Sequence, residues 1–346
     1  MFELEKLVKV VGDLIASLVT AVGLGSAWVT AVQLAVATLV VIVFASVTVL
    51  FLVWWERKVS ARIQMRVGPM RVGWHGALQT IADAVKLLQK EDITPAKVDR
   101  GIYYWAPVVT FVAALAVYVT IPFGKGLVVS DLNIGILYIL SVTTFTVIGL
   151  LMAGWSSNNK YSLLGGFRSA AQVVSYEVPM ALAILGVILF TQSLSMGDIV
   201  SQQSKVYEWF VFRQPIGFLI YLVAATAECN RTPFDLPEAD SELVAGFVTE
   251  YSGMKFAMFF LAEFLNMFSV SAIATTLFFG GWNGPFLPSW MWFMIKSLIG
   301  VFVLMWFRWT YPRLRVDQLM GFAWKFLLPL AFLNLLVTGF ILLLVK

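Results

Sequence analysis

Cysteine and histidine are almost absent from this 346-residue sequence, which holds only Cys229 and His75. A structural zinc site takes four Cys or His ligands, and an iron–sulfur cluster is normally held by four cysteine-type ligands. These counts exclude both kinds of site, a haem held by two histidines and an internal disulfide. The sequence also lacks the GxGxxG and GxxxxGK[ST] patterns that cradle phosphate groups. We therefore expect no cofactor on this chain, so any electron or nucleotide chemistry needs cofactors held by partner chains.

Charged residues are scarce as well, since they make up 13% of the chain while 60% is hydrophobic. Soluble domains carry about 25% charged residues, and several uncharged runs here are long enough to cross a bilayer. The sequence therefore predicts an all-α polytopic membrane protein with one transmembrane domain over residues 31–346. Its eight expected spans are 31–55, 102–123, 132–154, 173–191, 215–227, 255–281, 289–309 and 325–345, of which the fifth is short.

The first thirty residues are expected to lie outside this domain. They combine charges with an apolar second half, which predicts an N-terminal interfacial segment over residues 1–30 rather than a ninth span. The charged residues are Glu3, Glu5, Lys6, Lys9 and Asp13. No basic n-region precedes the apolar stretch, so no secretory signal is expected. No internal repeat supports the paired half-helices of many transporters.

Lysine and arginine are unevenly distributed over the loops of this eight-span layout. Of the 24, seventeen lie on the loops of one side, six lie on the side of both termini, and Lys296 lies within a span. Positively charged loops stay on the cytoplasmic side of a membrane. We therefore expect the long loops in the cytoplasm and both termini on the opposite side.

The first long loop contains "WWERKVSARIQMRVGPMRVGWHGALQTIADAVKLLQKED" and is rich in Arg and Lys. Basic loops often serve only to anchor a chain beside anionic lipid. Between residues 74 and 88, however, apolar residues recur at helical spacing, which predicts an amphipathic helix at the membrane interface. Asp83 and Lys86 would be neighbours on one flank of that helix, as an ordinary surface pair. We expect His75 to be structural.

Two glutamates, Glu177 and Glu263, fall inside apolar spans or near their ends. A charge at the centre of a span costs about 2.5–3.5 kcal/mol on insertion scales, and such residues usually mark ion or proton pathways. The alternative is that each lies near the interface, protonated or paired with a lysine, and Lys296 is one candidate partner. Pro179 should loosen the helix next to Glu177 by removing a backbone donor.

The stretch "AECNRTPFDLPEADSELVAGFVTE" is acidic although apolar segments surround it. Its acids are Glu228, Asp235, Glu238, Asp240, Glu242 and Glu250, and its one base is Arg231. Pro233 and Pro237 predict a loop, followed by a helix whose first turn favours Glu238 and Asp240. Glu242 lies four residues after Glu238, and like charges at that spacing repel each other, so one of two close carboxylates tends to hold a proton. Capping alone does not require six acids, and the arrangement suits proton transfer or the sensing of nearby charge.

Five stretches, in order along the chain, carry a family resemblance. They are "ERKVSARIQMRVGP", "ADAVKLLQKE", "AGWSSNNKYSLLGGFRSAAQVVSYE", "AECNRTPFDLPEADSELVAGFVTEYSGMKF" and "YPRLRVDQLMGFAWK". Together they resemble the H subunit of NADH–quinone oxidoreductase, the complex I membrane subunit called NADH dehydrogenase subunit 1 in mitochondria. The resemblance covers the chain from about residue 31 to its end. It implies an eight-span subunit that forms much of a quinone-access tunnel.

The resemblance also implies roles for individual residues. Those matching the quinone chamber or its mouth are Arg57, Arg66, Asp83 and Arg231. Those matching the acids that link the quinone cavity to proton pumping are Glu177, Glu228, Glu238, Asp240, Glu242 and Glu263. Asp240 stands where a glutamate is more usual, which keeps the charge but shortens its reach. Basic residues with an expected structural role are Lys86, Lys296, Arg313 and Arg315, although those in "YPRLRVDQ" could also steer a polar head group.

The resemblance implies the partners too. Quinone would be the substrate, while iron–sulfur clusters and flavin would belong to partner subunits. Those subunits would be the cluster-bearing peripheral arm, small membrane subunits and antiporter-like subunits, assembled in the lipid bilayer of a bacterial-type or thylakoid-like inner membrane. No nucleic-acid partner is expected. Quinone reduction, or a charged intermediate of it, would change the proton occupancy of the acids.

Three other functions fit part of the pattern. The membrane subunit of a respiratory hydrogenase or ferredoxin-linked complex would share the acidic path, but the near-complete loop between Glu56 and Asp99 favours the quinone enzyme. A stand-alone transporter or channel would also hold membrane acids, but the missing repeat and the family motifs argue against it. A pure scaffold leaves Glu177 and Glu263 unexplained.

Overall fold

The computed structural model describes residues 4–21, 25–237 and 240–345, and this part of the chain folds into helices without a β-strand. The α-helices are α1 (Leu4–Ala21), α2 (Ser26–Ile63), α3 (Gln79–Gln89), α4 (Arg100–Ala116), α5 (Gly135–Ser156), α6 (Lys160–Thr191), α7 (Met196–Ser201), α8 (Phe210–Arg213), α9 (Pro215–Glu228), α10 (Asp240–Leu243), α11 (Gly253–Phe278), α12 (Ser289–Thr310), α13 (Val316–Phe322) and α14 (Leu328–Val345).

Among the described residues, seven helices are long and apolar enough to cross a membrane. They are α2, α4 with the turn that follows it, α5, α6, α11, α12, and α13 continued into α14. The remaining predicted span, the fifth, is α9, which has 14 residues. At 1.5 Å per residue it measures about 21 Å, less than the roughly 30 Å hydrocarbon core. The structure thus confirms the all-α polytopic fold and the shortness of the fifth span.

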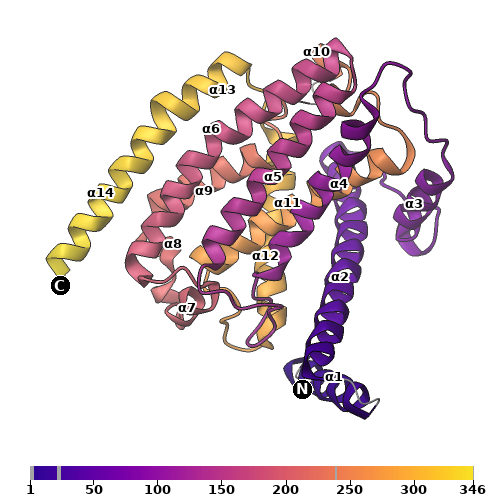
Figure 1. The fold of residues 1–346 in the computed structure, drawn as a ribbon. Helices are drawn as coiled ribbons and strands as arrows, with labels where there is room; N and C mark the ends of the chain where they lie inside the picture. Colours follow the sequence, from indigo (N-terminus) through magenta and orange to yellow (C-terminus); the bar gives the residue numbers. More distant parts are fainter. Residues whose placement is uncertain (1–3, 22–24, 238–239, 346) are drawn as a thin grey trace.

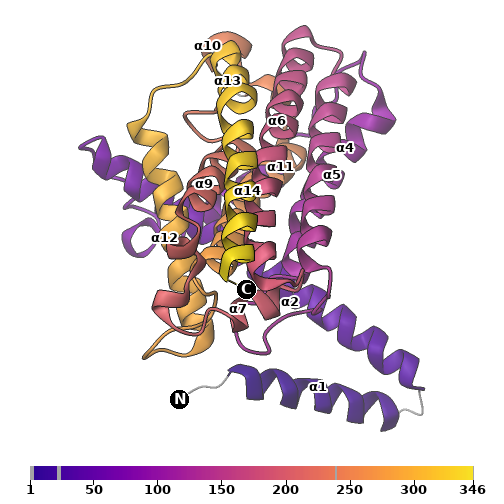
Figure 2. The ribbon, with the colours of Figure 1, turned by 90° about the vertical axis from the view of Figure 1, so that its left-hand side faces the viewer.

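The helices form a bundle around α11, the membrane-spanning candidate with the largest buried share. Helices α4, α5, α6 and α9 pack beside one another, and α14 covers the outer side of α6 and α9 (Figures 1 and 2). Helix α2 stands at the opposite flank against α11 and α12, with α3 projecting beyond it (Figure 1). Helix α1 lies crosswise at the lower end of α2 in both views.

Buried tyrosines connect the neighbouring helices to α11. Tyr118 donates a hydrogen bond to the carbonyl of Leu265 at 3.0 Å, and Tyr221 donates to the carbonyl of Val270 at 2.9 Å. Both rings are fully buried in the main apolar core. A buried hydroxyl costs free energy unless it is hydrogen-bonded, so these bonds fix how α4 and α9 sit against α11.

The acidic stretch is a loop where the prolines predict one. No helix is assigned from Cys229 to Pro237. The described helix α10 ends after four residues because Val244 and Gly246 take positive φ angles of 65° and 56°, which an α-helix cannot accommodate. The loop is compact, because the Phe234 N–H donates to the carbonyl of Arg231 at 2.8 Å.

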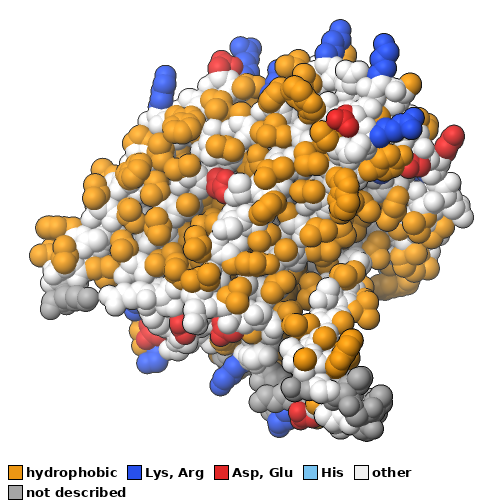
Figure 3. All heavy atoms as spheres, viewed as in Figure 1, with side chains coloured by type: hydrophobic (Ala, Val, Ile, Leu, Met, Phe, Trp, Pro, Cys, Tyr) orange, Lys and Arg blue, Asp and Glu red, His pale blue; other side chains and the backbone are white. Residues whose placement is uncertain are grey.

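The surface agrees with a chain that spans a membrane. Figure 3 shows hydrophobic side chains spread broadly across this face of the molecule, with Lys and Arg gathered at its upper and lower ends. The predicted amphipathic helix is α3, which starts at Gln79 rather than at residue 74. Its apolar residues Ile81, Val85 and Leu88 are exposed, as expected of a helix at an interface or against a partner.

Candidate functional site

Four charged side chains from different elements meet at one end of the bundle, and we call Glu56, Arg231, Glu263 and Arg308 the Arg231 cluster. Arg231 follows α9 and is 2% exposed. Its Nη1 donates to Glu56 Oε1 at 2.7 Å, and its Nε lies 3.0 Å from Glu263 Oε1. Arg308, in the last turn of α12, also binds Glu56 Oε1. The cluster joins α2, α11 and α12 to the acidic loop.

The two acids and two bases of the cluster balance each other. Burial opposes the charge of Arg231, but the carboxylates of Glu263 and Glu56 outweigh it and raise the pKa of Arg231 above its usual value. The guanidinium also stacks over the Phe264 ring, 4.8 Å from its centre. Among the described residues, Glu56 Oε2 and Arg231 Nη2 are buried without a hydrogen-bond partner. The buried network therefore keeps polar atoms whose hydrogen-bonding capacity is not fully used.

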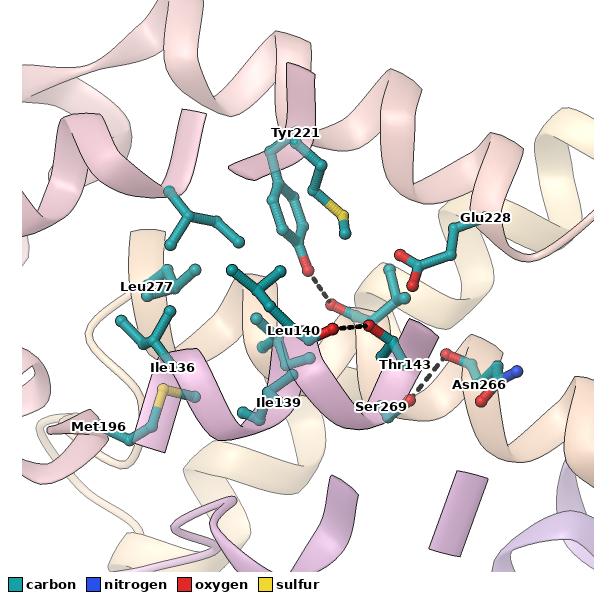
Figure 4. Close-up of a pocket in the computed structure, with 14 residues that line it drawn as sticks. Ile136, Ile139, Leu140, Thr143, Met196, Tyr221, Glu228, Asn266, Ser269 and Leu277 are labelled. Atoms are coloured by element: carbon teal, nitrogen blue, oxygen red, sulfur yellow. Dashed lines mark hydrogen bonds between the residues drawn. The ribbon is translucent and has the colours of Figure 1, made fainter. Parts of the chain in front are cut away.

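Glu228, the last residue of α9, lines two small cavities, and the second of them is also lined by Glu263 of this cluster. The first cavity, of about 20 Å³, is lined mainly by apolar side chains together with Thr143, Asn266 and Glu228. The second, of about 30 Å³, is lined by Glu228, Asn266 and Glu263 among others. Each volume accommodates a water molecule, which needs about 10–15 Å³ on this measure. Figure 4 shows the Glu228 carboxylate directed into the first cavity. Glu228 thus lines both cavities and Glu263 lines the second.

Glu177 lies on α6, is half-buried and lines neither cavity. Its Oε1 accepts a hydrogen bond from Thr144 Oγ1 of α5 at 2.9 Å. It is also close enough to Glu228 for the two carboxylates to repel each other. The structure therefore brings Glu177, Glu228 and Glu263 into one series.

Lys296 does not partner these glutamates, which corrects the expected pairing. Its ammonium group donates to the carbonyls of Phe279, Gly281 and Asn283 at 2.7, 3.0 and 2.6 Å. It also lies over the Trp209 ring at 4.4 Å. The C-terminal end of a helix carries partial negative charge, so this lysine is stabilised where α11 ends. Its role here is to cap a helix.

The predicted quinone-chamber residues fall in two places. Arg57, one residue beyond Glu56, forms an ion pair of 2.5 Å with Asp83 and so ties α3 to α2. Arg66 is exposed and donates to Gln64 at 2.6 Å, outside that pair. Arg231 belongs to the cluster described above. Lys86 is exposed on α3, and Asp83 turns to Arg57 rather than to this helical neighbour.

The remaining predicted residues lie around the acidic loop. Glu242 on α10 pairs with Arg168 of α6 at 2.6 Å and is half-exposed. Glu238 and the side chain of Asp240 lie outside the described residues, so the expected repulsion between Glu238 and Glu242 stays a prediction. Arg315 is exposed at the start of α13.

Arg313 pairs with Asp235 at 2.8 Å. Burial raises the pKa of Asp235 above its ordinary value, and the Arg313 guanidinium partly offsets that rise. The pair ties the acidic loop to the segment before α13.

Three charged residues of this region were not among the predicted site residues. Glu56 is the first charge after the 42-residue uncharged run over residues 14–55, a signal that could have marked it. Arg308 closes α12, and its partner is visible only in three dimensions. Lys255 is 8% exposed and pairs with Asp92 at 3.0 Å.

Comparison with known proteins gives consistent matches. The family described as "NADH dehydrogenase" matches residues 36–339. The H subunit of the NADH-quinone oxidoreductase of Dehalococcoides mccartyi (strain CBDB1) is 56% identical over 297 residues, which cover 86% of this chain and 83% of that protein. The protein of the same name from Carboxydothermus hydrogenoformans is 52% identical over 87% of this chain and 86% of its own length. In Geobacter sulfurreducens, the H subunit that carries the number 1 is 48% identical over 88% of this chain and 93% of its own length.

Proposed function

Because this chain belongs to the family of the NADH–quinone oxidoreductase H subunits, we propose that it lines the quinone-access chamber of that complex and carries the acidic path that couples quinone reduction to proton translocation. Family membership makes it a membrane subunit of an enzyme complex. The chamber and the path are inferred from the arrangement of its side chains. The observation that carries the inference is that Glu228 lines both cavities, shares the second with Glu263 of the Arg231 cluster and lies close enough to Glu177 for their carboxylates to repel each other.

The chamber is proposed near the charged end of α2. Arg57 and Asp83 join α2 to α3 there, and α3 exposes Ile81 and Leu88 beside that pair. An apolar surface next to a guanidinium and a carboxylate suits a ligand with an apolar tail and a carbonyl-bearing ring. Small-molecule pockets are mostly apolar and hold a few precisely placed polar groups. Glu56 lies one residue before Arg57, so a change in ligand charge at Arg57 acts on the Arg231 cluster at short range.

The path is proposed to run from Glu263 through Glu228 to Glu177. A carboxylate in a largely apolar site shares protons readily with a nearby carboxylate, because only one of them is easily ionised. Water in the two cavities would bridge the separations, with Asn266 lining both of them. Reduction of the quinone, or a charged intermediate of it, would shift proton occupancy at Glu263 and pass that change towards Glu177.

Electrons and the remaining machinery are assigned to partners. The chain has one cysteine and one histidine, so the flavin and the iron–sulfur clusters are placed in peripheral-arm subunits. Glu177 is half-buried on the outer helix α6, which suits contact with the small membrane subunits and antiporter-like subunits. Helix α1, crosswise at the end of α2, suits an interfacial segment over residues 1–30, ahead of one domain over residues 31–346.

The path is tested with Glu177→Gln, Glu228→Gln and Glu263→Gln, introduced singly into the intact complex in its membrane. Glutamine keeps the size of the side chain and cannot ionise. We expect proton pumping, measured in inverted vesicles beside NADH-driven quinone reduction, to fall about tenfold or more, since placed proton carriers contribute factors of about 10²–10⁴.

The matched control is Glu208→Gln in the short turn before α8, where Ser204 donates to the carboxylate at 2.8 Å. This acid lies away from the proposed path, and its replacement should leave both rates unchanged. Full pumping in all three path variants would remove these acids from the mechanism.

A further inference from the structure

One uncharged side chain, Gln172 on α6, contacts the turn that carries Glu228 and Arg231. It is 1% exposed. Its Nε2 lies 2.8 Å from the carbonyl of Ala227, 2.8 Å from the carbonyl of Phe234 and 3.1 Å from Asn230 Oδ1. These acceptors stand at the beginning, the middle and the end of the turn, so one amide group holds the whole of it.

The turn has backbone hydrogen bonds of its own, but it also holds a residue in an unfavourable backbone conformation. The Asn230 N–H donates to the carbonyl of Ala227 at 3.1 Å, and Asn230 takes a positive φ of 50°. A non-glycine residue in the left-handed region costs free energy that surrounding contacts must offset. Gln172 supplies such a contact directly, through the side-chain oxygen of Asn230.

The chemistry at this position requires an amide nitrogen. Two N–H groups of Gln172 face three oxygen atoms, whereas its Oε1 is buried without a hydrogen-bond partner among the described residues. Exchanging the two ends of the amide would turn an oxygen towards three oxygens. A carboxylate of the same size would present a negative charge to the same acceptors.

We propose that Gln172 is a positioning residue, which holds the turn from Ala227 to Phe234 against α6 so that Glu228 faces the cavities and Arg231 meets Glu56 and Glu263. The inference rests on the coupling role proposed for these side chains. Gln172 lies on the same helix as Glu177, five residues earlier, so its amide holds the turn with Glu228 against the helix that carries Glu177. A loosened turn would break the alignment between them while the apolar core of the bundle stays intact.

The turn contains its own reporter. Cys229 is the sole cysteine of the chain, is 2% exposed, and lies between Glu228 and Asn230. Reaction of this thiol with N-ethylmaleimide requires the turn to open. The modified peptide can be identified by mass spectrometry after labelling of the intact complex.

The experiment compares Gln172→Met and Gln172→Glu with the unchanged complex. Methionine fills the space without donating, so two hydrogen bonds are lost and labelling of Cys229 should rise about tenfold or more. Gln172→Glu should have at least the same effect. In both variants the number of protons pumped per quinone reduced should fall, and a mere loss of assembled complex leaves that ratio unchanged.

Gln203 provides the matched control at the other end of the bundle. It is also fully buried, and its Nε2 likewise faces three carbonyls, those of Ile199, Thr276 and Leu277. Its Oε1 also accepts from the N–H groups of Phe210 and Gly280, so Gln203→Met removes a larger clamp away from the acids. It should leave Cys229 labelling and the pumping ratio unchanged, even if less complex assembles.

Each outcome decides the inference. Unchanged labelling and an unchanged ratio in Gln172→Met overturn it, while the proposed path stands if Glu228→Gln and Glu263→Gln still lose pumping. Full pumping in those acid variants overturns the path instead. If Gln172→Met does not assemble, Gln172→Asn, a shorter amide, takes its place in both measurements. If neither Gln172 variant assembles while Gln203→Met assembles normally, Gln172 has only a folding role and the proposal is rejected.

Discussion

Arg231 keeps its charge where almost no water reaches it. Its two carboxylate partners contact different nitrogens, Nη1 for Glu56 and Nε for Glu263. Only a guanidinium can place two donors in that fixed geometry, since a lysine offers one nitrogen on a flexible stem. Removing one member of a buried ion pair costs about 3–5 kcal/mol, because it leaves an uncompensated charge behind.

Arg231→Met should therefore lower the stability of the subunit by about 3–5 kcal/mol. The loss appears as a lower thermal midpoint of the purified complex and as less assembled subunit in the membrane. Glu56 still binds Arg308 in that variant, so Glu263 is the carboxylate left without its ion-pair partner. Adding Glu263→Gln removes this stranded charge, so the double variant should be more stable than Arg231→Met alone. A double variant that is less stable than Arg231→Met would contradict the pairing.

The Asp235–Arg313 pair gives a dependence on pH. The raised pKa of Asp235 means that the folded state holds this proton more tightly than the unfolded chain does. Stability from this group is therefore present at low pH and declines as pH rises through the raised pKa. Arg313→Gln removes the group that lowers the pKa, so the decline should become steeper.

The measurement is the thermal midpoint of the intact complex at several pH values from about 4, the ordinary pKa of an aspartate, upwards. Arg315→Gln, an exposed arginine two residues away, is the control and should keep the slope of the unchanged protein. A slope for Arg313→Gln equal to that control would argue against burial as the cause.

Individual residues differ in how well the sequence predicts them. A carboxylate in an apolar run is easily recognised, and Glu177 and Glu263 do lie within α6 and α11. Lys296, one candidate partner in the alternative interpretation, instead binds backbone carbonyls, and residue type alone does not indicate such contacts. The contacts of Gln172 cannot be predicted from the sequence for a similar reason, since two of its acceptors are backbone oxygens.

Among elements, the connection between α3 and α4 depends on the first turn of α11. The Lys255 ammonium pairs with Asp92, donates to Thr94 at 3.3 Å and lies 3.8 Å from the centre of the Tyr104 ring. The Ile93 N–H donates to Ser252 Oγ at 3.0 Å beside it. These contacts thus attach the segment that follows α3 to α11, the helix that carries Glu263.

Lys255→Met should release this segment, since a desolvated cation–π contact contributes up to about 2 kcal/mol. We expect faster amide exchange over residues 90–99 in the intact complex, with α5 and α9 unaffected. Lys97→Met, at an exposed position of the same segment, is the control. Equal exchange in the two variants would show that Lys255 does not hold the segment.

Secondary-structure elements are predictable where one contribution to the free energy dominates. Long uncharged runs predict the membrane-spanning helices because a backbone buried in lipid must satisfy its hydrogen bonds internally, as a helix does. The boundaries inside the acidic stretch are less predictable, since α10 ends at a left-handed Val244 that only its surroundings stabilise. The start of α3 shifts by several residues for the same reason, with Gly73 and His75 in positive φ.

At the scale of the whole molecule, the two ends of the bundle carry unequal charge. Arg315 lies at the upper end, where α13 begins, and Lys205 lies at the lower end, between α7 and α8 (Figure 1). The excess of basic residues on the loops of the upper end predicts that this end faces the cytoplasm.

This orientation is testable with a membrane-impermeant maleimide, because the native thiol is buried. In right-side-out vesicles we expect Lys205→Cys to react and Arg315→Cys to stay unlabelled. The unchanged chain, with Cys229 alone, reports background. The reverse pattern would invert the assigned topology.

Helix α2 also has a consequence through its length. Its 38 residues measure about 57 Å, and even at a tilt of about 40° they rise about 44 Å, well beyond a hydrocarbon layer of about 30 Å. The helix therefore extends beyond the hydrocarbon layer, and the end with Glu56 and Arg57 is the charged one. Under the proposed function, the quinone ring leaves the hydrocarbon layer to reach Arg57, so the distance from Arg57 to that layer sets the length of tail that keeps the molecule anchored in the bilayer.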